Sequence, residues 1–341
     1  MRRLFGIAAA LVLSAPAAAQ TPAAVKGDFK GETINISVGY PAGGAPDLYF
    51  RVLSRHYARH IPGNPLIVVK NMPGAGTLRA ANYIYNVAAK DGTELGNFSS
   101  SATMEPLMDN DQAKFDATRF SWIGSMNQEI NFCGIWQRPG APKSFAEMLK
   151  QETVFASAGG LTSFSYQHPL IFKNVLGAHV KMVSGYPGMP QSFIALQRGE
   201  AHGLCGMVRT HIKTLWPQEV QDGRFKIVVQ MGPKTTNDLG PVPSIYEFVK
   251  KEEDRKVLAF HFNTKLLGRP LAGPPGVPPE RLAVLRKAFL DTMRDPEFLS
   301  EAQKANLDID PATHEQVEQL LAQFADYPKD VLEKAKQAIT R

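Results

Sequence analysis

The stretch Ile34-Asn-Ile-Ser-Val-Gly-Tyr-Pro-Ala-Gly-Gly-Ala-Pro-Asp47 decides the fold of the first part of the chain. Apolar and polar residues alternate in its first half, which predicts a β-strand. The pair Gly43-Gly44 then predicts a tight turn. Asp47 is expected to be the N-cap of a helix that continues to His60. A strand, a glycine turn and a helix in this order are typical of an α/β lobe.

The glycine pair leaves backbone amides uncovered, and the start of the next helix adds a positive dipole end. An anion can bind at such a turn without a charged side chain. The alternative is a turn that only links a strand to a helix. Further polar turns at the same edge of the predicted sheet would favour the anion site.

Three predicted strands, 34–38, 66–70 and 94–98, alternate with helices. This order predicts a parallel sheet with helices on its faces. A second glycine turn at 71–76 and the polar run 99–103 also follow strands. The carboxyl ends of parallel strands meet at one edge of a sheet, so we expect a binding cleft there.

The same design recurs about 115 residues later. A strand at 154–156 leads into Ser157-Ala-Gly-Gly-Leu-Thr-Ser163 and then a helix over 165–176. We interpret this as a second lobe with a second anion-binding turn that faces the first. Further on, the apolar run Val257–Phe262 is predicted to be a strand, and long amphipathic helices follow residue 280.

The first 19 residues combine a basic start, a short apolar run and Ala17-Ala18-Ala19 before Gln20. They predict a cleaved signal peptide for general secretion, with Arg2-Arg3 leaving twin-arginine export open. Removing them lowers the formal net charge from +6 to +4, with 36 basic against 32 acidic residues. No long apolar run or concentrated basic stripe follows, so neither a membrane-inserted nor a nucleic-acid-binding protein is expected.

Cys133 and Cys205 are the two cysteines of the chain. Both lie in apolar contexts that resemble strands. In an exported chain they can form one disulfide, but buried free thiols fit equally well. The sequence leaves both alternatives open.

Several motifs together resemble the substrate-binding proteins of tripartite tricarboxylate transporters, the Bug or TctC-like family. They are Tyr-Pro-Ala-Gly-Gly-Ala-Pro-Asp47, Val-Lys-Asn-Met-Pro-Gly-Ala-Gly76, Lys-Asp-Gly-Thr93, Ala156-Ser-Ala-Gly159, Gly-Tyr-Pro-Gly188, Pro241-Val-Pro-Ser244 and Pro274-Pro-Gly-Val-Pro278. The similarity covers essentially the whole mature chain in order. Pro46 replaces a usual Thr, which removes a hydroxyl and an amide beside the first turn.

The resemblance implies a type II periplasmic-binding-protein fold of two doubly wound α/β lobes joined by crossover strands. We expect lobe 1 to comprise 20–118 and 236–341, and lobe 2 to comprise 119–235. Family members hold carboxylates largely through backbone amides and hydroxyls. The implied ligand-binding residues are Tyr40, Ala42, Gly43, Gly44, Asp47, Ser101, Thr103, Ser157, Gly159, Thr162, Ser163 and Tyr186. Asp47 is expected to organise its turn rather than face an anionic ligand.

The expected function is a monomeric periplasmic receptor that captures a small organic carboxylate, aromatic acids included, and delivers it to a membrane permease. No cofactor, metal or catalytic residue is expected. A receptor that presents its ligand to a membrane sensor kinase would use the same fold. A secreted hydrolase is a weaker alternative, because the sequence has no Gly-x-Ser-x-Gly motif and its histidines are scattered.

Overall fold

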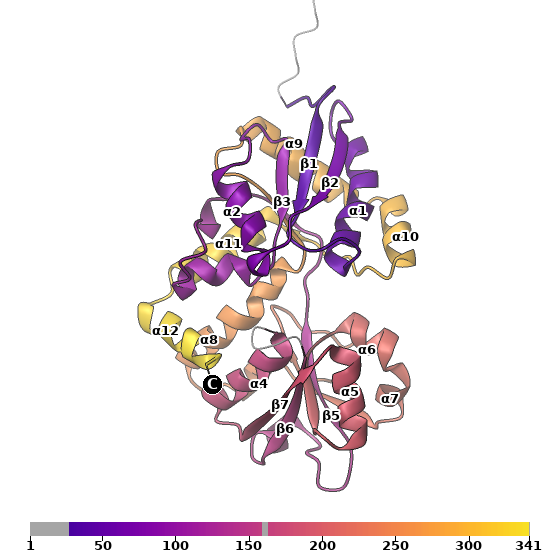
Figure 1. The fold of residues 1–341 in the computed structure, drawn as a ribbon, viewed down its shortest axis with the longest axis vertical. Coiled ribbons are helices and arrows are strands. Elements are labelled where there is room, and N and C mark those ends of the chain that lie inside the picture. The colour runs from indigo at the N-terminus through magenta and orange to yellow at the C-terminus, as the bar shows by residue number, and fades with distance from the viewer. Residues whose placement is uncertain (1–26, 159–162, 341) are drawn as a thin grey trace, which may run out of the picture.

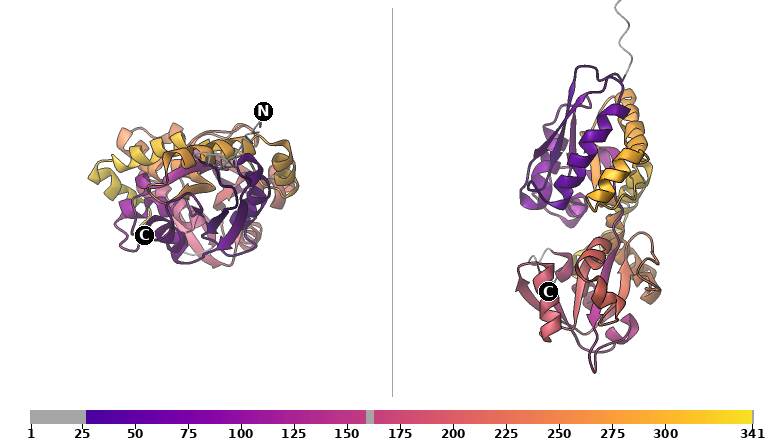
Figure 2. Two further views of the ribbon diagram at one scale, coloured as in Figure 1. Left: turned by 90° about the horizontal axis from the view of Figure 1, so that it is seen from above. Right: turned by 90° about the vertical axis from the view of Figure 1, so that its right-hand side faces the viewer.

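The computed structural model describes residues 27–158 and 163–340. Two α/β lobes lie end to end along the long axis of the molecule (Figure 1). Each lobe contains one β-sheet with helices against it, and the segments that join the lobes run along one side (Figure 2). The predicted signal peptide lies outside the described residues. Among those described, no helix has the length and apolar character needed to cross a membrane.

In the first sheet, β1 (Thr33–Val38) pairs in parallel with both of its neighbours. Its apolar residues Ile34, Ile36 and Val38 are fully buried, so the predicted alternation is confirmed. The strand order is β11-β4-β10-β3-β1-β2. The other strands are β2 (Leu66–Asn71), β3 (Glu94–Asn97), β4 (Ser121–Ser125), β10 (Pro270–Gly273) and β11 (Ala312–Thr313).

Helix α1 (Ala45–Tyr57) follows the glycine turn and packs on β2. Its N-cap is Gly44, so the prediction of Asp47 as N-cap is wrong. Pro46 allows this earlier start because its fixed φ suits the first helical turn and its missing amide needs no partner there. The other helices of the lobe are α2 (Leu78–Asn86), α9 (Pro279–Thr292), α10 (Pro296–Lys304) and α11 (His314–Ala325).

The second sheet has the strand order β7-β6-β8-β5-β9. Its strands are β5 (Asn131–Trp136), β6 (Thr153–Ala158), β7 (Val180–Tyr186), β8 (Gly203–Val208) and β9 (Phe225–Met231). β6 runs parallel to β7 and β8, whereas β5 is antiparallel to β8 and β9. The helices of this lobe are α3 (Phe145–Met148), α4 (Phe164–Leu176), α5 (Met189–Arg198), α6 (Arg209–Leu215) and α7 (Pro217–Gln221).

The two cysteines form a disulfide between the adjacent strands β5 and β8. Both residues are fully buried. Cys133 and Cys205 are 72 residues apart in the sequence, so the bond closes a long loop. By the chain-entropy model such a bond stabilises the folded state by about 4 kcal/mol. The structure thus contains a disulfide where the sequence allowed either a disulfide or two buried free thiols.

The chain first crosses from the first lobe to the second after β4, through residues 126–130, and returns before β10, through residues 263–269. These two segments are the crossings. Because β4 belongs to the first sheet, the predicted start of the second lobe at residue 119 has to move beyond Ser125. β4 pairs antiparallel with β10, which comes about 150 residues later in the chain, and no local pattern reveals such a partner. The two crossings are hydrogen-bonded to each other: Glu129 N donates to Lys265 O at 2.8 Å and Gly268 N donates to Asn127 O at 3.0 Å.

Residues Val257–Phe262, predicted as a strand, form the end of helix α8 (Glu252–Phe262). A short apolar run fits a buried helix as well as a buried strand. Three acidic residues in the first turn favour the helix through its dipole. α12 (Lys329–Ala338) packs on α8 and α4. The 3₁₀ helices are η1 (Ala58–His60), η2 (Ala75–Thr77), η3 (Ala102–Met108), η4 (Ala117–Arg119), η5 (Ile245–Phe248) and η6 (Asn263–Leu267).

Candidate functional site

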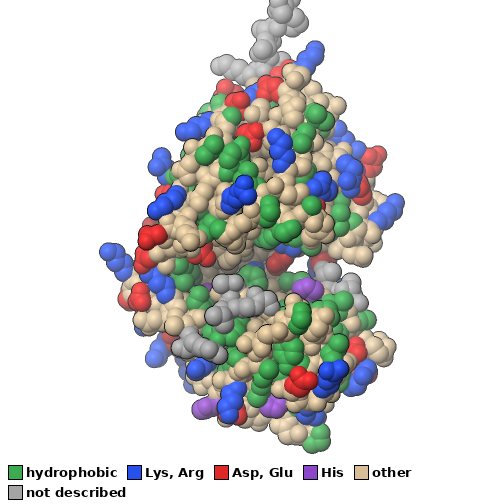
Figure 3. Space-filling model, viewed as in Figure 1, with side chains coloured by type: hydrophobic (Ala, Val, Ile, Leu, Met, Phe, Trp, Pro, Cys, Tyr) green, Lys and Arg blue, Asp and Glu red, His purple; other side chains and the backbone are tan. Residues whose placement is uncertain are grey.

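A cleft of about 720 Å³ lies between the two lobes. Figure 3 shows the surface hollowed at this level. The first lobe lines it with Tyr40, Ala45, Pro46, Tyr49, Ser99 and Ser100, and the segment after α10 adds 306–310. The crossings contribute 127–131, Lys265, Gly268 and Arg269. The second lobe contributes Phe132, Phe164, Gly206, Val208, Arg209, His211, 234–236 and Asp238.

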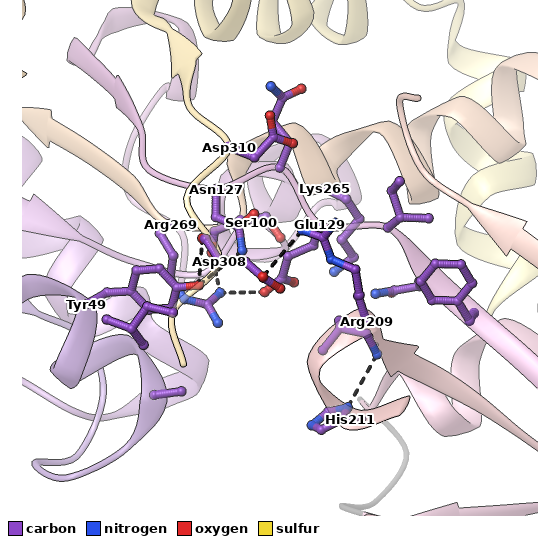
Figure 4. A pocket seen from close by; sticks show the side chains of 18 of the residues that line it. Tyr49, Ser100, Asn127, Glu129, Arg209, His211, Lys265, Arg269, Asp308 and Asp310 are labelled. Carbon is purple, nitrogen blue, oxygen red and sulfur yellow. Dashed lines mark hydrogen bonds and ion pairs between the residues drawn. The ribbon is translucent and has the colours of Figure 1, made fainter. Parts of the chain in front are cut away.

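Arg269 and Glu129 form an ion pair between the two crossings (Figure 4). Arg269 Nη1 lies 2.8 Å from Glu129 Oε1, and the side chains are only 16% and 15% exposed. The guanidinium also lies 4.9 Å from the ring centroid of Tyr49. The Tyr49 hydroxyl donates to the backbone oxygen of Asp308 at 2.9 Å. Burial raises the pKa of Tyr49 to about 12, so this hydroxyl remains a donor. The positive charge of Arg269 is therefore already balanced within the protein.

Two further cations of the cleft are also paired. Arg209 lies 2.5 Å from Asp238 and 3.4 Å from Asp308, and Lys234 contacts Asp310. Asp308 and Asp310 follow α10 in the first lobe, whereas Arg209 and Lys234 belong to the second-lobe wall. These ion pairs therefore connect the lobes across the cleft.

Lys265 differs from the other three cations. It lies in η6, is 1% exposed, and forms no ion pair with any residue in the described part of the chain. Its Nζ lies 3.1 Å from the ring centroid of Phe164, which begins α4. Burial lowers the pKa of Lys265 to about 7, partly opposed by the nearby charge of Glu129. The cleft therefore contains one buried ammonium group without an acidic partner.

Asn131, at the start of β5, lines the same cleft and is 1% exposed. Neither Oδ1 nor Nδ2 has a hydrogen-bond partner among the described residues. A buried amide without partners costs about 1–3 kcal/mol, so a bound polar group would offset this cost. Lys265 and Asn131 are thus two buried polar groups in one cleft, and each can bind a further group.

The first glycine turn is held together by Asp47. This buried carboxylate accepts hydrogen bonds from Gly43 N, Arg51 Nε and Asn71 Nδ2, each at 2.8 Å. Burial tends to raise the pKa of Asp47, but these hydrogen bonds outweigh it and hold the pKa below its usual value. One of the amides predicted to bind an anion, that of Gly43, is therefore engaged inside the turn.

The second turn is described only at its two ends, because Gly159 and Thr162 lie outside the described residues. Ser157 is buried, and its Oγ lies 3.3 Å from Ser165 Oγ. Ser163 Oγ lies 3.0 Å from the same atom. The Ser165 hydroxyl also bonds both backbone groups of Ala158. These hydroxyls join the end of β6 to the start of α4.

Of the predicted site residues that the structure describes, Tyr40 lines the cleft. Burial raises the pKa of its hydroxyl. Ser101 lies on the surface with its Oγ 2.7 Å from Ser99 Oγ, and the buried Thr103 donates to Ser100 O at 2.6 Å. The Tyr186 hydroxyl donates to Glu200 at 2.8 Å. Ala42 and Gly44 are exposed at the turn.

Sequence reasoning missed Lys265, Asn131, Glu129 and Arg269. All four lie in or beside the crossings, which carry no motif and come together only in the folded chain. The local signal for Lys265 is weak: it precedes the apolar Leu266-Leu267, but the polar Asn263-Thr264 separates it from Phe262. Lysine is almost never fully buried without a partner, so its burial here was not to be expected from the sequence.

Within residues 27–158 and 163–340, no group of three or more His, Cys, Asp or Glu side chains is arranged to hold a metal ion. The features described above are instead those of a solute-binding protein. Two α/β lobes, hydrogen-bonded crossings and a cleft with buried polar groups define this class.

The comparisons place the chain within that class. Residues 49–339 match the model of the tripartite tricarboxylate transporter family receptor, TctC. The chain therefore belongs to this family of solute-binding receptors. The UPF0065 protein in the gbd 5' region of Cupriavidus necator is 24% identical over 347 residues, which cover 98% of each chain.

Solved structures share the fold at low sequence identity. A TctC solute-binding protein from Polaromonas, solved without ligand, has a TM-score of 0.69 at 18% identity and covers 89% of this chain and 98% of its own. MatC from Rhodopseudomonas palustris with bound malate gives 0.56 at 17%, covering 88% and 98%. A second R. palustris protein, solved with adipate, gives 0.59 at 16%, covering 90% and 98%.

Proposed function

We propose that this chain is the periplasmic receptor of a tripartite tricarboxylate-type transporter. It captures a small organic carboxylate between its lobes and delivers it to a membrane permease. The observation that carries the proposal is the buried ammonium of Lys265, which lines the cleft between the lobes and has no acidic partner among the described residues. Malate and adipate in the two R. palustris proteins of the same fold support a carboxylate as the ligand.

The location follows from the export signal. Residues 1–19 direct the chain to the periplasm and are removed before Gln20. Mass spectrometry of the protein purified from the periplasm should give the mass of residues 20–341. Recovery of the uncleaved chain from the cytoplasm would refute this part of the proposal.

Lobe closure brings the glycine turns toward the ligand. The remaining amides at Ala42 and Gly44, and the hydroxyls at Ser157 and Ser163, then complete the contacts that the crossings begin. Gly44→Ala tests the first turn, since a β-carbon there meets nothing closer than 3.6 Å and φ stays in the ordinary range. This variant should keep the melting temperature of the wild type. Its affinity for the ligand should fall only if the turn touches the ligand.

A thermal-shift screen of residues 20–341 against mono-, di- and tricarboxylates, amino acids and neutral sugars tests the receptor function. A ligand at 100 times its dissociation constant adds about 2.7 kcal/mol to the free energy of unfolding. We expect at least one carboxylate to raise the melting temperature clearly. Stabilisation by neutral solutes alone would contradict a carboxylate receptor.

The permease partner requires an experiment in cells. Deletion of the gene should abolish uptake of the labelled ligand, and the wild-type gene should restore it. Purified protein should return the ligand chemically unchanged after long incubation. Normal uptake in the deletion strain would show that this chain is not needed for transport of that ligand.

A further inference from the structure

We propose that Lys265, assisted by the amide of Asn131, anchors the carboxylate of the ligand, and that the ligand is a monocarboxylate with an apolar body. This inference rests on the proposed function and names the substrate class of the same cleft. It assigns the anchor to the crossings between the lobes, whereas the sequence had pointed to the glycine turns.

The first argument is the cost of burying Lys265. An ammonium group taken out of water without a counter-charge is strongly unfavourable. The Phe164 ring, 3.1 Å from Nζ, offsets only part of this cost. No described acidic side chain pairs with the ammonium group, and residues 1–26, 159–162 and 341 contain neither Asp nor Glu. A counter-charge from outside the protein would complete the site.

The second argument concerns the geometry of the donor groups. Asn131 lies two residues beyond Glu129, whose backbone amide donates to the Lys265 carbonyl at 2.8 Å. Both side chains line one cleft, and both are 1% exposed. The ammonium group and the amide Nδ2 are both donors, so each can donate to one oxygen of a carboxylate that binds between them.

The third argument sets the ligand's charge. The other cations that line the cleft, Arg209, Lys234 and Arg269, already contact acidic side chains. Among the described residues, Lys265 is the one lining cation outside these ion pairs, and it can balance one carboxylate. A second carboxylate would meet a wall on which Arg209, Lys234 and Arg269 face four carboxylates, those of Glu129, Asp238, Asp308 and Asp310. A desolvated charge without a partner loses more affinity than it gains.

The fourth argument concerns the rest of the ligand. The rings of Tyr40, Tyr49, Phe132 and Phe164 line the same cleft. Aromatic rings favour a flat or apolar body through stacking and burial of surface.

The first glycine turn offers fewer donors than the sequence suggested, because Gly43 N already donates to Asp47 at 2.8 Å. This turn therefore has fewer free donors for the carboxylate.

The anchor also makes binding sensitive to pH. The groups that face Lys265 are Glu129 and Arg269, which pair with each other, and His168 of α4. His168 is buried and its pKa is far below the usual value, mainly through burial, so it stays neutral near pH 7. Lys265, with a pKa of about 7 in the free protein, is protonated below this pH and loses its proton above it.

The test is isothermal titration of residues 20–341 with benzoate, adipate and citrate. Lys265→Met keeps an unbranched side chain that is shorter by one atom and removes the charge. Lys287→Met on α9 is the matched control, because that side chain is 78% exposed and does not line the cleft. We expect benzoate to bind at least tenfold more tightly than adipate or citrate.

Lys265→Met should weaken benzoate binding about 10- to 100-fold, the loss typical of a hydrogen bond to a charged group. Its melting temperature should stay the same or rise, because an unpaired buried charge is removed. Between pH 6 and 8 the wild-type affinity should fall about tenfold. Benzoate stays ionised over this range, and the variant should show no such fall. Lys287→Met should behave as wild type in every measurement.

The results separate this inference from the proposed function. Tighter binding of adipate or citrate, together with an unchanged affinity of Lys265→Met, would overturn the Lys265 anchor and leave a carboxylate receptor standing. Absence of binding by every acid would overturn both. A lower melting temperature of Lys265→Met with unchanged affinity would show that the lysine is structural.

Discussion

At the scale of single residues, Asp47 decides how the first glycine turn is used. Its carboxylate is 2% exposed and accepts three hydrogen bonds, from Gly43, Arg51 and Asn71. The carboxylate of Asp47 thus connects the glycine turn, helix α1 and the end of β2. The sequence predicted that this carboxylate organises the turn. It did not predict that the carboxylate would occupy one of the turn's own amides, that of Gly43.

Asp47→Asn should lower the free energy of unfolding by about 1–3 kcal/mol, because the variant removes charge-assisted hydrogen bonds from a buried site. The folded-state pKa of Asp47 lies below its ordinary value. Its contribution is therefore complete above the unfolded pKa and disappears as the pH falls through the folded pKa. Urea unfolding at pH 7 and at pH 3 measures both effects.

Asp326→Asn is the control for this prediction, since Asp326 is exposed at the end of α11. It should change the stability by less than about 0.5 kcal/mol. If Asp47→Asn were as stable as this control at pH 7, the hydrogen bonds to Asp47 would not hold the turn.

At the scale of elements, η1, which directly follows α1, is joined to α10 by a network of charges. Arg59 bonds Asp295 and Glu297, and His60 Nε2 lies 2.8 Å from Asp295 Oδ2. Asp295 is also the N-cap of α10 and accepts from Glu297 N at 2.9 Å. One side chain thus starts a helix and fixes it to its neighbour.

Asp295→Ala should destabilise the protein by about 2 kcal/mol, because it removes the cap and the ion pair together. Asp295→Asn keeps a capping oxygen and should cost less than about 1 kcal/mol, as expected for a partly exposed ion pair. Chemical denaturation of the two variants measures the difference. Equal losses would show that the charge matters and the cap does not.

At the scale of the whole molecule, the two lobes are joined by more than the crossings. A buried apolar cluster continues from Trp122 in the first sheet through Phe260 of α8 to Phe172 in the second lobe. The ion pairs of Arg209 with Asp308 and of Lys234 with Asp310 also connect the lobes. When the lobes close, they must therefore pivot about the side that carries this apolar cluster, and the cleft on the opposite side narrows.

A ligand that binds both walls of the cleft should shift the molecule toward a closed form. Small-angle X-ray scattering of residues 20–341 should show a smaller radius of gyration at saturating ligand than without it. Lys265→Met should need about 10- to 100-fold more benzoate than the wild type to reach the smaller radius. An unchanged radius of the saturated wild type would mean that the cleft binds without closing.

Much of the fold could be predicted from the sequence alone. The alternation at Ile34, Ile36 and Val38, the glycine turn and the following helix are local features, and local sterics and burial determine them. The parallel pairing of β1 with β2 and β3 follows from the strand and helix order. The predicted export signal and the family resemblance likewise rest on the sequence alone.

Only the tertiary structure decided the rest. It pairs β4 with β10, joins Cys133 to Cys205, and makes Val257–Phe262 the end of a helix. It also brings Lys265 and Asn131 from distant segments into one cleft. Pairing, burial and the absence of a counter-charge depend on neighbours that are far away in the chain, so no local pattern of residues can reveal them.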